Sequence, residues 1–518
     1  MSHGSRAARW LAAGAAAVAL SVIASGCTAG GTASPSTSGA SSSDGALVVG
    51  VTSDPDTLFP WKATQFQSVN VLQNIYGTLT EFDQDLNVVP GLAESWDVSE
   101  DGLTVTFTLR DGVTFDDGSA FDSADVKYSL DTIKEEATAA VAAATLTSVT
   151  TVEAPDPTTV VLTLATPDAG LLAGLASVNL AILSSDDTEE SLNTTPNGTG
   201  PFEFDQRTAS QSLTLSRFDE YWGDPATLAS VEFRVIPDET SIVSALQSGN
   251  VQFAVFDDPL VAQTAETGTV TVEETPQLSY HALQLNASRD VLSDVNVRLA
   301  IQCAIDRDQV LQTAALGEGE VTGPITSPAY KSDPDARPCP TRDLDKAKDY
   351  LDKAGLSGGV TIDTIVSQGE YATSVNEAQN LQSQLAEAGI TLNLEVLESG
   401  AYVDRWVAGD FDAAVALNGG RPDPDGMYGR YFTSTGNLNK VAGYSSLELD
   451  ALFAEGKATA DPDARKAIYD DVSKLLEDNA VWIWMFTSYT YTATDSSVQG
   501  FQPMANGSLQ YLRTTTVG

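Results

Sequence analysis

Residues 103–130 read LTVTFTLRDGVTFDDGSAFDSADVKYSL, and this stretch carries the clearest structural pattern in the chain. In its first half apolar residues alternate with Thr and Arg, as in a strand with one buried face, at Leu103, Val105, Phe107 and Leu109. Asp111-Gly112 is a typical turn and the alternation resumes at Val113, so we predict a β-hairpin. The second half predicts a helix, capped by Ser123 or Asp122, whose buried face is formed by Val126, Leu130 and Ile133.

A strand–helix–strand pattern follows in the second half of the chain. Residues 360–366 and 390–396 each predict a strand, and between them a helical stripe is formed by Val375, Ala378, Leu381, Leu385 and Ala388. Strands joined through a helix by short links belong to a parallel or mixed sheet. Residues 148–153 and 159–164, on either side of a Pro-Asp-Pro turn, predict a further strand pair. The body is therefore α/β, with a more antiparallel insert near residues 81–197.

The composition excludes several classes of function. The chain has 518 residues, about three structural units at roughly 150 residues each. Its 71 acidic and 27 basic residues give a net charge of −44, which argues against a nucleic-acid partner, because phosphate binding needs clustered cations. Only two histidines occur, His3 and His281, so that a Ser-His or Cys-His mechanism has one candidate base in the body.

The N-terminus predicts export. Arg6 and Arg9 precede a 13-residue apolar run at 11–23, which is too short to span a bilayer and fits a signal peptide over 1–26. The following Ala24-Ser25-Gly26-Cys27 resembles a lipobox, in which Cys27 carries lipid; the alternative is an ordinary signal peptide cut nearby, with Cys27 incidental. Residues 27–44 then form a flexible, Ser/Thr/Gly-rich tether.

Two cysteines remain in the body, Cys303 and Cys339. An exported protein meets an oxidising environment, so the even number predicts one disulfide, and the alternative is two free buried thiols.

Other motifs do not point to a catalytic or metal site. Gly198-Thr199-Gly200-Pro201 lacks the Lys of a P-loop, and we interpret it as a tight turn. Residues 421–426 have the spacing of a calcium loop, but Arg421 and Phe432 occupy positions that need acidic ligands. His281 has no metal ligand nearby in sequence, which favours a structural role. We therefore expect no metal and no cofactor.

Nine segments in order resemble the extracytoplasmic solute-binding proteins of ABC importers, family 5, which includes peptide-, nickel- and oligosaccharide-binding members. The resemblance covers nearly all of the mature chain, and residues 103–130 match its most specific signature. The other eight segments are GTGPFEF (198–204), RFDEYWGDPA (217–226), ALQSGNVQFAV (245–255), NVRLAIQCAIDRDQVLQTAALG (296–317), DLDKAKDYLDKAG (343–355), LAEAGITLNLEVLE (385–398), GDFDAAV (409–415) and PDPD (422–425).

The resemblance implies the two-lobe type II periplasmic-binding-protein fold, an α/β fold with an extra subdomain in lobe I. Lobe I would comprise residues 45–282 plus 480–518, with the insert at about 81–197, and lobe II residues 283–479. The lobes would be linked by residues 278–286 and 481–491. Alternate aromatic residues of the second link either face the cleft or belong to the core.

The implied function is that of a receptor rather than an enzyme. It would be a monomer, held by its lipid at the extracytoplasmic face of the cell membrane, that captures a peptide or similar oligomeric solute for an ABC permease. An oligosaccharide-binding member is the alternative within the family. Two alternatives do not involve transport. One is a secreted hydrolase that uses paired carboxylates, and the other is an adhesion or signalling receptor with the same fold.

The expected ligand-binding residues come from the same resemblance. In peptide-binding relatives an Asp binds the ligand amino group, and that position is Gly420 here; the Arg that binds the carboxylate corresponds to Gln368. Both charged anchors are absent, so we expect other polar side chains to replace them. Loops that follow strands from both lobes converge in such folds, which predicts a cleft lined by Thr57, Trp61, Gln368, Asn418, Gly420, Arg421 and Asp423.

Overall fold

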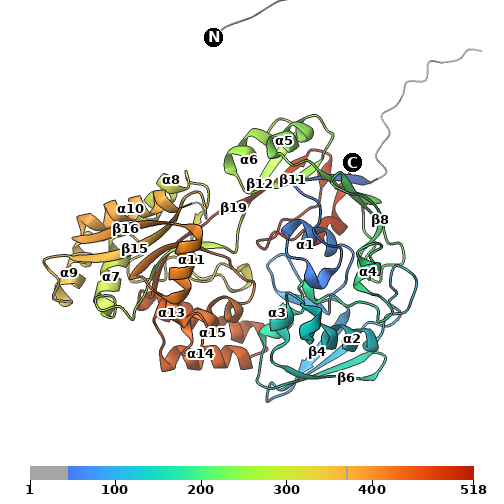
Figure 1. Ribbon diagram of the computed structural model, residues 1–518, viewed down its shortest axis with the longest axis horizontal. Coiled ribbons are helices and arrows are strands. Elements are labelled where there is room, and N and C mark those ends of the chain that lie inside the picture. The colour runs from blue at the N-terminus through green and yellow to red at the C-terminus, as the bar shows by residue number, and fades with distance from the viewer. Residues whose placement is uncertain (1–44, 369–370) are drawn as a thin grey trace, which may run out of the picture. The chain divides into compact units, whose positions relative to one another are not determined.

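The computed structural model describes residues 45–368 and 371–518 and builds them around two large mixed sheets (Figure 1). The predicted signal peptide, Cys27 and the predicted tether lie outside the described residues. None of the helices within the described ranges combines the length and apolar character that a bilayer crossing requires.

The first sheet has seven strands and contains the beginning of the described chain. β1 pairs in parallel with β10 and β11, while β19 is antiparallel to β11 and β12. Two helices, α5 and α6, pack together and contact the β11–β19 region of this sheet. The strand order is β12 (Val270–Pro276), β19 (Tyr489–Asp495), β11 (Phe253–Phe256), β1 (Ala46–Val51), β10 (Ser230–Val235), β9 (Ser212–Arg217) and β8 (Phe202–Thr208).

The second sheet has six strands and confirms the strand–helix–strand prediction. β15 and β16 pair in parallel from Val360↔Ile390 to Gln368↔Glu398, and α10 packs on both. All but Val375 of the predicted helical stripe are buried. The order is β14 (Glu320–Val321), β18 (Trp482–Thr487), β13 (Tyr280–Leu285), β17 (Ala413–Asn418), β15 (Val360–Gln368) and β16 (Ile390–Glu398).

The insert contains a four-stranded antiparallel sheet, where one prediction is wrong and two are confirmed. Residues 113–115 do not fold back on β5, because β4 and β7 already occupy both edges of that strand. The predicted pair at 148–164 forms as β6 and β7, and α2 begins with an Asp122 capping box. The order is β4 (Ala93–Val98), β5 (Thr104–Leu109), β7 (Thr159–Leu164) and β6 (Val149–Asp156).

The remaining elements surround these sheets. Two short pairs are formed by β2 (Thr80–Phe82) with β3 (Val88–Pro90) and by β20 (Val498–Gln499) with β21 (Thr516–Val517). The helices are α1 (Phe66–Leu72), α2 (Ser123–Lys134), α3 (Gly170–Gly174), α4 (Glu189–Leu192), α5 (Glu239–Gln247), α6 (Pro259–Ala265), α7 (Val295–Ala304), α8 (Arg307–Ala314), α9 (Leu344–Lys353), α10 (Ser374–Glu387), α11 (Ser399–Ala408), α12 (Arg430–Phe432), α13 (Asn439–Ala442), α14 (Leu447–Ala458) and α15 (Pro462–Asp478).

The chain passes between the two large sheets at two neighbouring points. One is the link 277–279 between β12 and β13, and the other is Ser488 between β18 and β19. The two links are hydrogen-bonded, since Gln277 N donates to Ser488 O at 2.9 Å and Thr487 Oγ1 donates to Ser279 O at 2.6 Å. The aromatic residues of β18 are fully buried, so they belong to the core rather than to a cleft: Trp482, Trp484 and Phe486.

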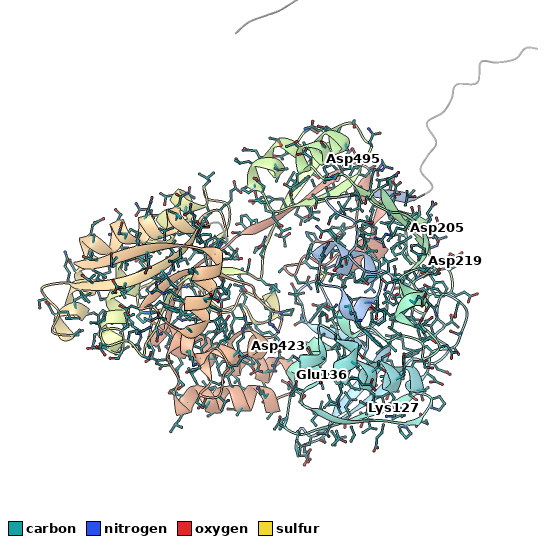
Figure 2. All side chains as sticks on the ribbon, viewed as in Figure 1. Lys127, Glu136, Asp205, Asp219, Asp423 and Asp495 are labelled. Atoms are coloured by element: carbon teal, nitrogen blue, oxygen red, sulfur yellow. A yellow bond between two sulfur atoms is a disulfide. The ribbon has the colours of Figure 1, made fainter. Side chains whose placement is uncertain are left out.

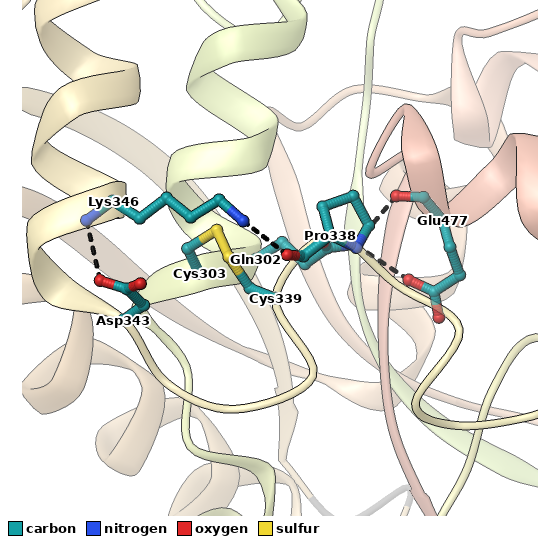
Figure 3. Close-up of a disulfide and its surroundings, with 7 residues drawn as sticks. All are labelled: Gln302, Cys303, Pro338, Cys339, Asp343, Lys346 and Glu477. Atoms are coloured by element: carbon teal, nitrogen blue, oxygen red, sulfur yellow. Dashed lines mark hydrogen bonds between the residues drawn. A yellow bond between two sulfur atoms is a disulfide. The ribbon is translucent and has the colours of Figure 1, made fainter.

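Cys303, on α7, is joined to Cys339 by a disulfide (Figure 3). The loop that holds Cys339 is also fixed by Lys346 of α9, whose Nζ donates to Pro338 O at 2.7 Å. On the other side, Gln302 Nε2 donates to Glu477 Oε2 at 2.9 Å. The disulfide thus lies in a region where α7, α9 and α15 are held together.

Candidate functional site

A cavity of about 630 Å³ opens beside the loop that follows β17. One wall comes from segments before residue 223 and from the C-terminal segment 506–513. The other wall is the loop 421–426, where Figure 2 labels Asp423 near the α3 side of the insert. Its polar and aromatic lining includes Tyr76, Glu81, Asp168, Tyr221, Trp222, Arg421, Asp423, Asp425, Ser508, Gln510 and Arg513, and small residues line much of the rest.

The first wall contains one ion pair, between Glu81 and Arg513, and the adjacent rings of Tyr221 and Trp222. Arg513 Nη2 contacts Glu81 Oε2 at 2.7 Å, so the charge of each is compensated. The Arg110 guanidinium lies 4.4 Å from the ring centroid of Trp222, whose indole N–H donates to Thr199 O at 3.0 Å. The ring of Tyr221 lies 4.9 Å from that of Trp222. This wall therefore offers a solute aromatic surface beside a charge-compensated ion pair.

The second wall contains two carboxylates, those of Asp423 and Asp425, and each forms an ion pair. Asp423 is buried and forms an ion pair with Arg465 of α15, while its Oδ1 accepts from the main-chain N–H of Asp425 at 3.0 Å. Burial raises the pKa of Asp425 to about 6, although Lys457 at 3.4 Å acts in the opposite direction.

A third carboxylate of the cavity lining is that of Asp168, two residues before α3. Burial raises its pKa, and the Ser148 hydroxyl, which donates to it at 2.7 Å, partly offsets that effect. The next residue makes a main-chain contact across the cavity rim, because Ala169 N donates to Lys457 O at 2.8 Å. The α14–α15 segment and the insert are therefore in direct contact here.

Of the residues predicted from the sequence, the structure brings Arg421 and Asp423 into the cavity wall. Asn418 is buried at the end of β17, where it donates to Tyr280 Oη at 3.3 Å. Gly420 packs against the chain link between the sheets, since a Cβ at this position would lie 1.8 Å from Leu278 O. No side chain fits there, so position 420 contributes only main chain.

Three other predicted residues lie outside the cavity lining. Thr57 donates to Asn193 Oδ1 at 2.8 Å, and Trp61 is a core residue, 2% exposed, whose indole donates to Ala181 O at 2.9 Å. Gln368 is exposed at the end of β15. The loop-after-strand rule thus selected a loop at 421–423 that lines the cavity, whereas the predicted side chains of the other two loops do not line it.

Several lining residues escaped the sequence analysis. Tyr221 and Trp222 lie in the quoted segment RFDEYWGDPA, whose two adjacent aromatic residues were a usable signal. Asp168 comes shortly after the predicted strand 159–164, so the loop-after-strand rule applied to the insert would have found it. The pairing of Glu81 with Arg513 joins residues 432 positions apart and has no local signal.

His281 has the structural role that its strand pattern favoured. Its Nδ1 lies 2.9 Å from Glu377 Oε1 and its Nε2 lies 3.2 Å from Ser488 Oγ. The ring stacks on Phe486 at 4.2 Å between centroids. Among the described residues no group of three or more His, Cys, Asp or Glu side chains is arranged to hold a metal ion.

Comparison with known proteins gives a consistent result. The model of the bacterial extracellular solute-binding proteins, family 5 (middle), matches residues 87–439. The chain is 27% identical to the glutathione-binding protein GsiB of Escherichia coli O6:K15:H31 over 471 residues, which cover 88% of this chain and 91% of that protein. It is 28% identical to the dipeptide-binding protein of Escherichia coli K12 over 463 residues, covering 82% and 86% of the two chains.

The fold is also that of solved structures. HbpA2 from Haemophilus parasuis superposes with a TM-score of 0.83 at 25% identity, over 91% of this chain and all of that one. The similarity of fold therefore extends over most of the chain.

Proposed function

The chain belongs to family 5 of the bacterial extracellular solute-binding proteins, and from this premise we propose that it captures a peptide or a similar oligomeric solute for an ABC importer. The relatives named for glutathione and for dipeptides, which match most of the chain, support a peptide-like solute. The observation that carries the proposal is the cavity itself. Its volume of about 630 Å³ falls within the roughly 300–1,000 Å³ typical of small-molecule sites.

The proposed mechanism is closure of two lobes around the solute. We place the lobe boundaries at the links 277–279 and 488, where the chain leaves one large sheet for the other. This is slightly different from the division at 282/283 and 479/480 expected from the sequence. A solute that contacts both walls of the cavity binds the closed arrangement more tightly and so shifts the population toward it.

We further propose that the protein is exported and anchored through lipid on Cys27. The support is the sequence Ala24-Ser25-Gly26-Cys27 together with the uncharged segment that follows it. In this arrangement the membrane contact is the lipid alone, the body is a monomer at the extracytoplasmic face, and the partner is the transmembrane part of an ABC permease.

An oligosaccharide is the second candidate solute, because Tyr221 and Trp222 present adjacent aromatic faces to the cavity. Calorimetric titration with tetra-alanine and, separately, with maltotetraose distinguishes the two. The peptide proposal predicts saturable binding of tetra-alanine and none of maltotetraose up to millimolar concentration. The reverse result would replace the peptide by a sugar, and release of alanine or glucose during the titration would instead support a hydrolase.

A further inference from the structure

Two arginines on the segment after β17 have no acidic partner among the described residues. Within the described ranges, no carboxylate lies at ion-pair distance from Arg421 or Arg430 and neither side chain donates a hydrogen bond. Every other arginine of the described ranges has an ion pair or donates a side-chain hydrogen bond. The positive charge is therefore left available to something outside the chain.

The contrast with the other charges of the cavity is clear. Arg513 is paired with Glu81 at 2.7 Å, Asp423 with Arg465, and Asp425 with Lys457 at 3.4 Å. Asp168 accepts from Ser148. Of the two cationic side chains that line the cavity, only Arg421 has no carboxylate to compensate it.

A short helical segment connects the two arginines. Residues Asp425–Gly429 form a π-helix that leads directly into α12 at Arg430; π-turns are rare and occur often at functional sites. The Arg421 side chain lies over Gly426, where a Cβ would come within 3.5 Å of Cδ.

Arg430 acts electrostatically on Arg421 but does not line the cavity itself. Its guanidinium lies 4.6 Å from the ring centroid of Tyr431, and its Nε is buried without a partner. Partial burial and then the charge of Arg430 lower the pKa of Arg421, so the two cations repel each other in this arrangement. An anion placed against Arg421 would relieve that repulsion.

We propose that Arg421 binds an anionic group of the solute, a carboxylate, and that Arg430 strengthens this site through a second positive charge nearby. A guanidinium matches a carboxylate in planar, two-bond geometry. The proposal rests on the proposed solute-binding role of the cavity, but not on the solute being a peptide. It makes the receptor selective for solutes with an acidic end or an acidic side group.

Two pairs of probes test the inference separately from the peptide proposal. The first pair is tetra-alanine and its C-terminal amide, and the second is tetragalacturonate and maltotetraose. In each pair the members resemble each other in size, and the first has the carboxylate. We expect the acidic member of at least one pair to bind about tenfold or more tightly than its neutral counterpart, the usual effect of one charge-assisted contact.

The arginine variants then locate the effect. Arg421→Gln should abolish the preference for the acidic member, and Arg430→Gln should reduce it by about twofold to fivefold at low salt, since a more distant charge is more strongly screened. Arg405→Gln is the matched control, because Arg405 is paired with Glu395 and does not line the cavity. Thermal unfolding of each variant shows whether it is folded.

The possible outcomes test the anion inference and the peptide proposal separately. Equal affinity for both members of each pair, binding of no acidic probe, or an unchanged preference in folded Arg421→Gln would overturn the anion inference. Binding of tetragalacturonate without either alanine probe would sustain it and overturn the peptide proposal. Binding of both alanine probes with equal affinity, without binding of tetragalacturonate, would overturn the anion inference and sustain the peptide proposal.

Discussion

Asp423 shows how a single buried ion pair shapes one wall of the cavity. Its partner Arg465 is 4% exposed, and the Arg465 Nε also donates to Gly456 O at 2.9 Å. Because this arginine compensates the carboxylate, Asp423 is a structural member of the wall and not a free anchor for a cationic group. Removal of one partner from such a pair leaves an uncompensated buried charge.

We therefore expect Arg465→Leu to lower the free energy of unfolding by about 3 kcal/mol or more. Urea unfolding at neutral pH is the measurement. Lys466→Ala is the matched control on the same helix, since Lys466 forms only an exposed pair with Asp470, and it should change stability by no more than about 0.5 kcal/mol. If Arg465→Leu lowers the free energy of unfolding no more than the control does, the Asp423–Arg465 pair contributes little to stability.

Asp116 provides a pH-dependent prediction. Burial raises its pKa from 3.8 to about 8, even though the Gly198 N–H, which donates to it at 3.1 Å, favours the charged form. The folded protein thus holds a proton that the unfolded chain loses above pH 4, so the contribution of Asp116 to stability falls as the pH rises from about 4 to about 8.

Asp116→Asn should remove this loss of stability at higher pH. We expect the variant to gain stability relative to the wild type as the pH is raised from 4 to 8.5, measured by urea unfolding across that range. Asp111→Asn, at an exposed position that is not among the charges acting on Asp116, should leave the pH profile of stability unchanged. A parallel profile for Asp116→Asn and the wild type would contradict the assigned protonation.

Of the side chains predicted from the sequence, two line the cavity, and most of its lining was not predicted. Arg421 and Asp423 were predicted because the loop follows a strand, and β17 does end immediately before it. Trp61 was misplaced because the same rule does not say which way a side chain points, and the indole lies in the core. Glu81 and Arg513 meet only through the tertiary fold, so that no local pattern predicts them.

At the scale of elements, periodicity was a reliable guide wherever one face is buried. The stripe on α10 and the alternation on β16 were visible because each packs one face on the core. The hairpin expected at 103–115 failed because alternation shows that a segment is half-buried but not which strand it pairs with. Here β5 lies between β4 and β7, strands before and after it in the chain.

The disulfide is the element-scale contact that we expect to matter most for stability. It closes a loop between residues 36 positions apart and ties α7 to the segment before α9. Reduction should lower the free energy of unfolding by about 3–4 kcal/mol on the loop-entropy model. Urea unfolding with and without dithiothreitol measures this.

A double variant, Cys303→Ala with Cys339→Ala, serves as the control for that measurement. Its stability should not respond to dithiothreitol and should match that of the reduced wild type within the cost of the lost sulfurs. Two titratable thiols in the unfolded, unreduced wild type would contradict the bond itself.

For the molecule as a whole, lipid on Cys27 would keep the receptor beside its permease. Cys27→Ala should release the protein from washed membranes into the soluble fraction, because several acyl chains at about 0.8 kcal/mol per buried CH₂ provide the anchor. Fractionation in high salt followed by immunoblotting is the measurement. Cys339→Ala, which leaves Cys27 intact, is the matched control and should stay with the membrane. A Cys27→Ala protein that also remains there would exclude the lipid anchor.

The central claim is that the cavity between the two walls holds a captured solute. Ala144 is exposed and lines the cavity, whereas Ala137, in the same segment, is exposed outside it. Native mass spectrometry, after incubation with a tryptic digest of casein and desalting, should show one bound peptide on the wild type and on Ala137→Trp, and none on Ala144→Trp, where the indole fills the cavity. Retention of a peptide by Ala144→Trp, or its absence from the wild type, would contradict the claim.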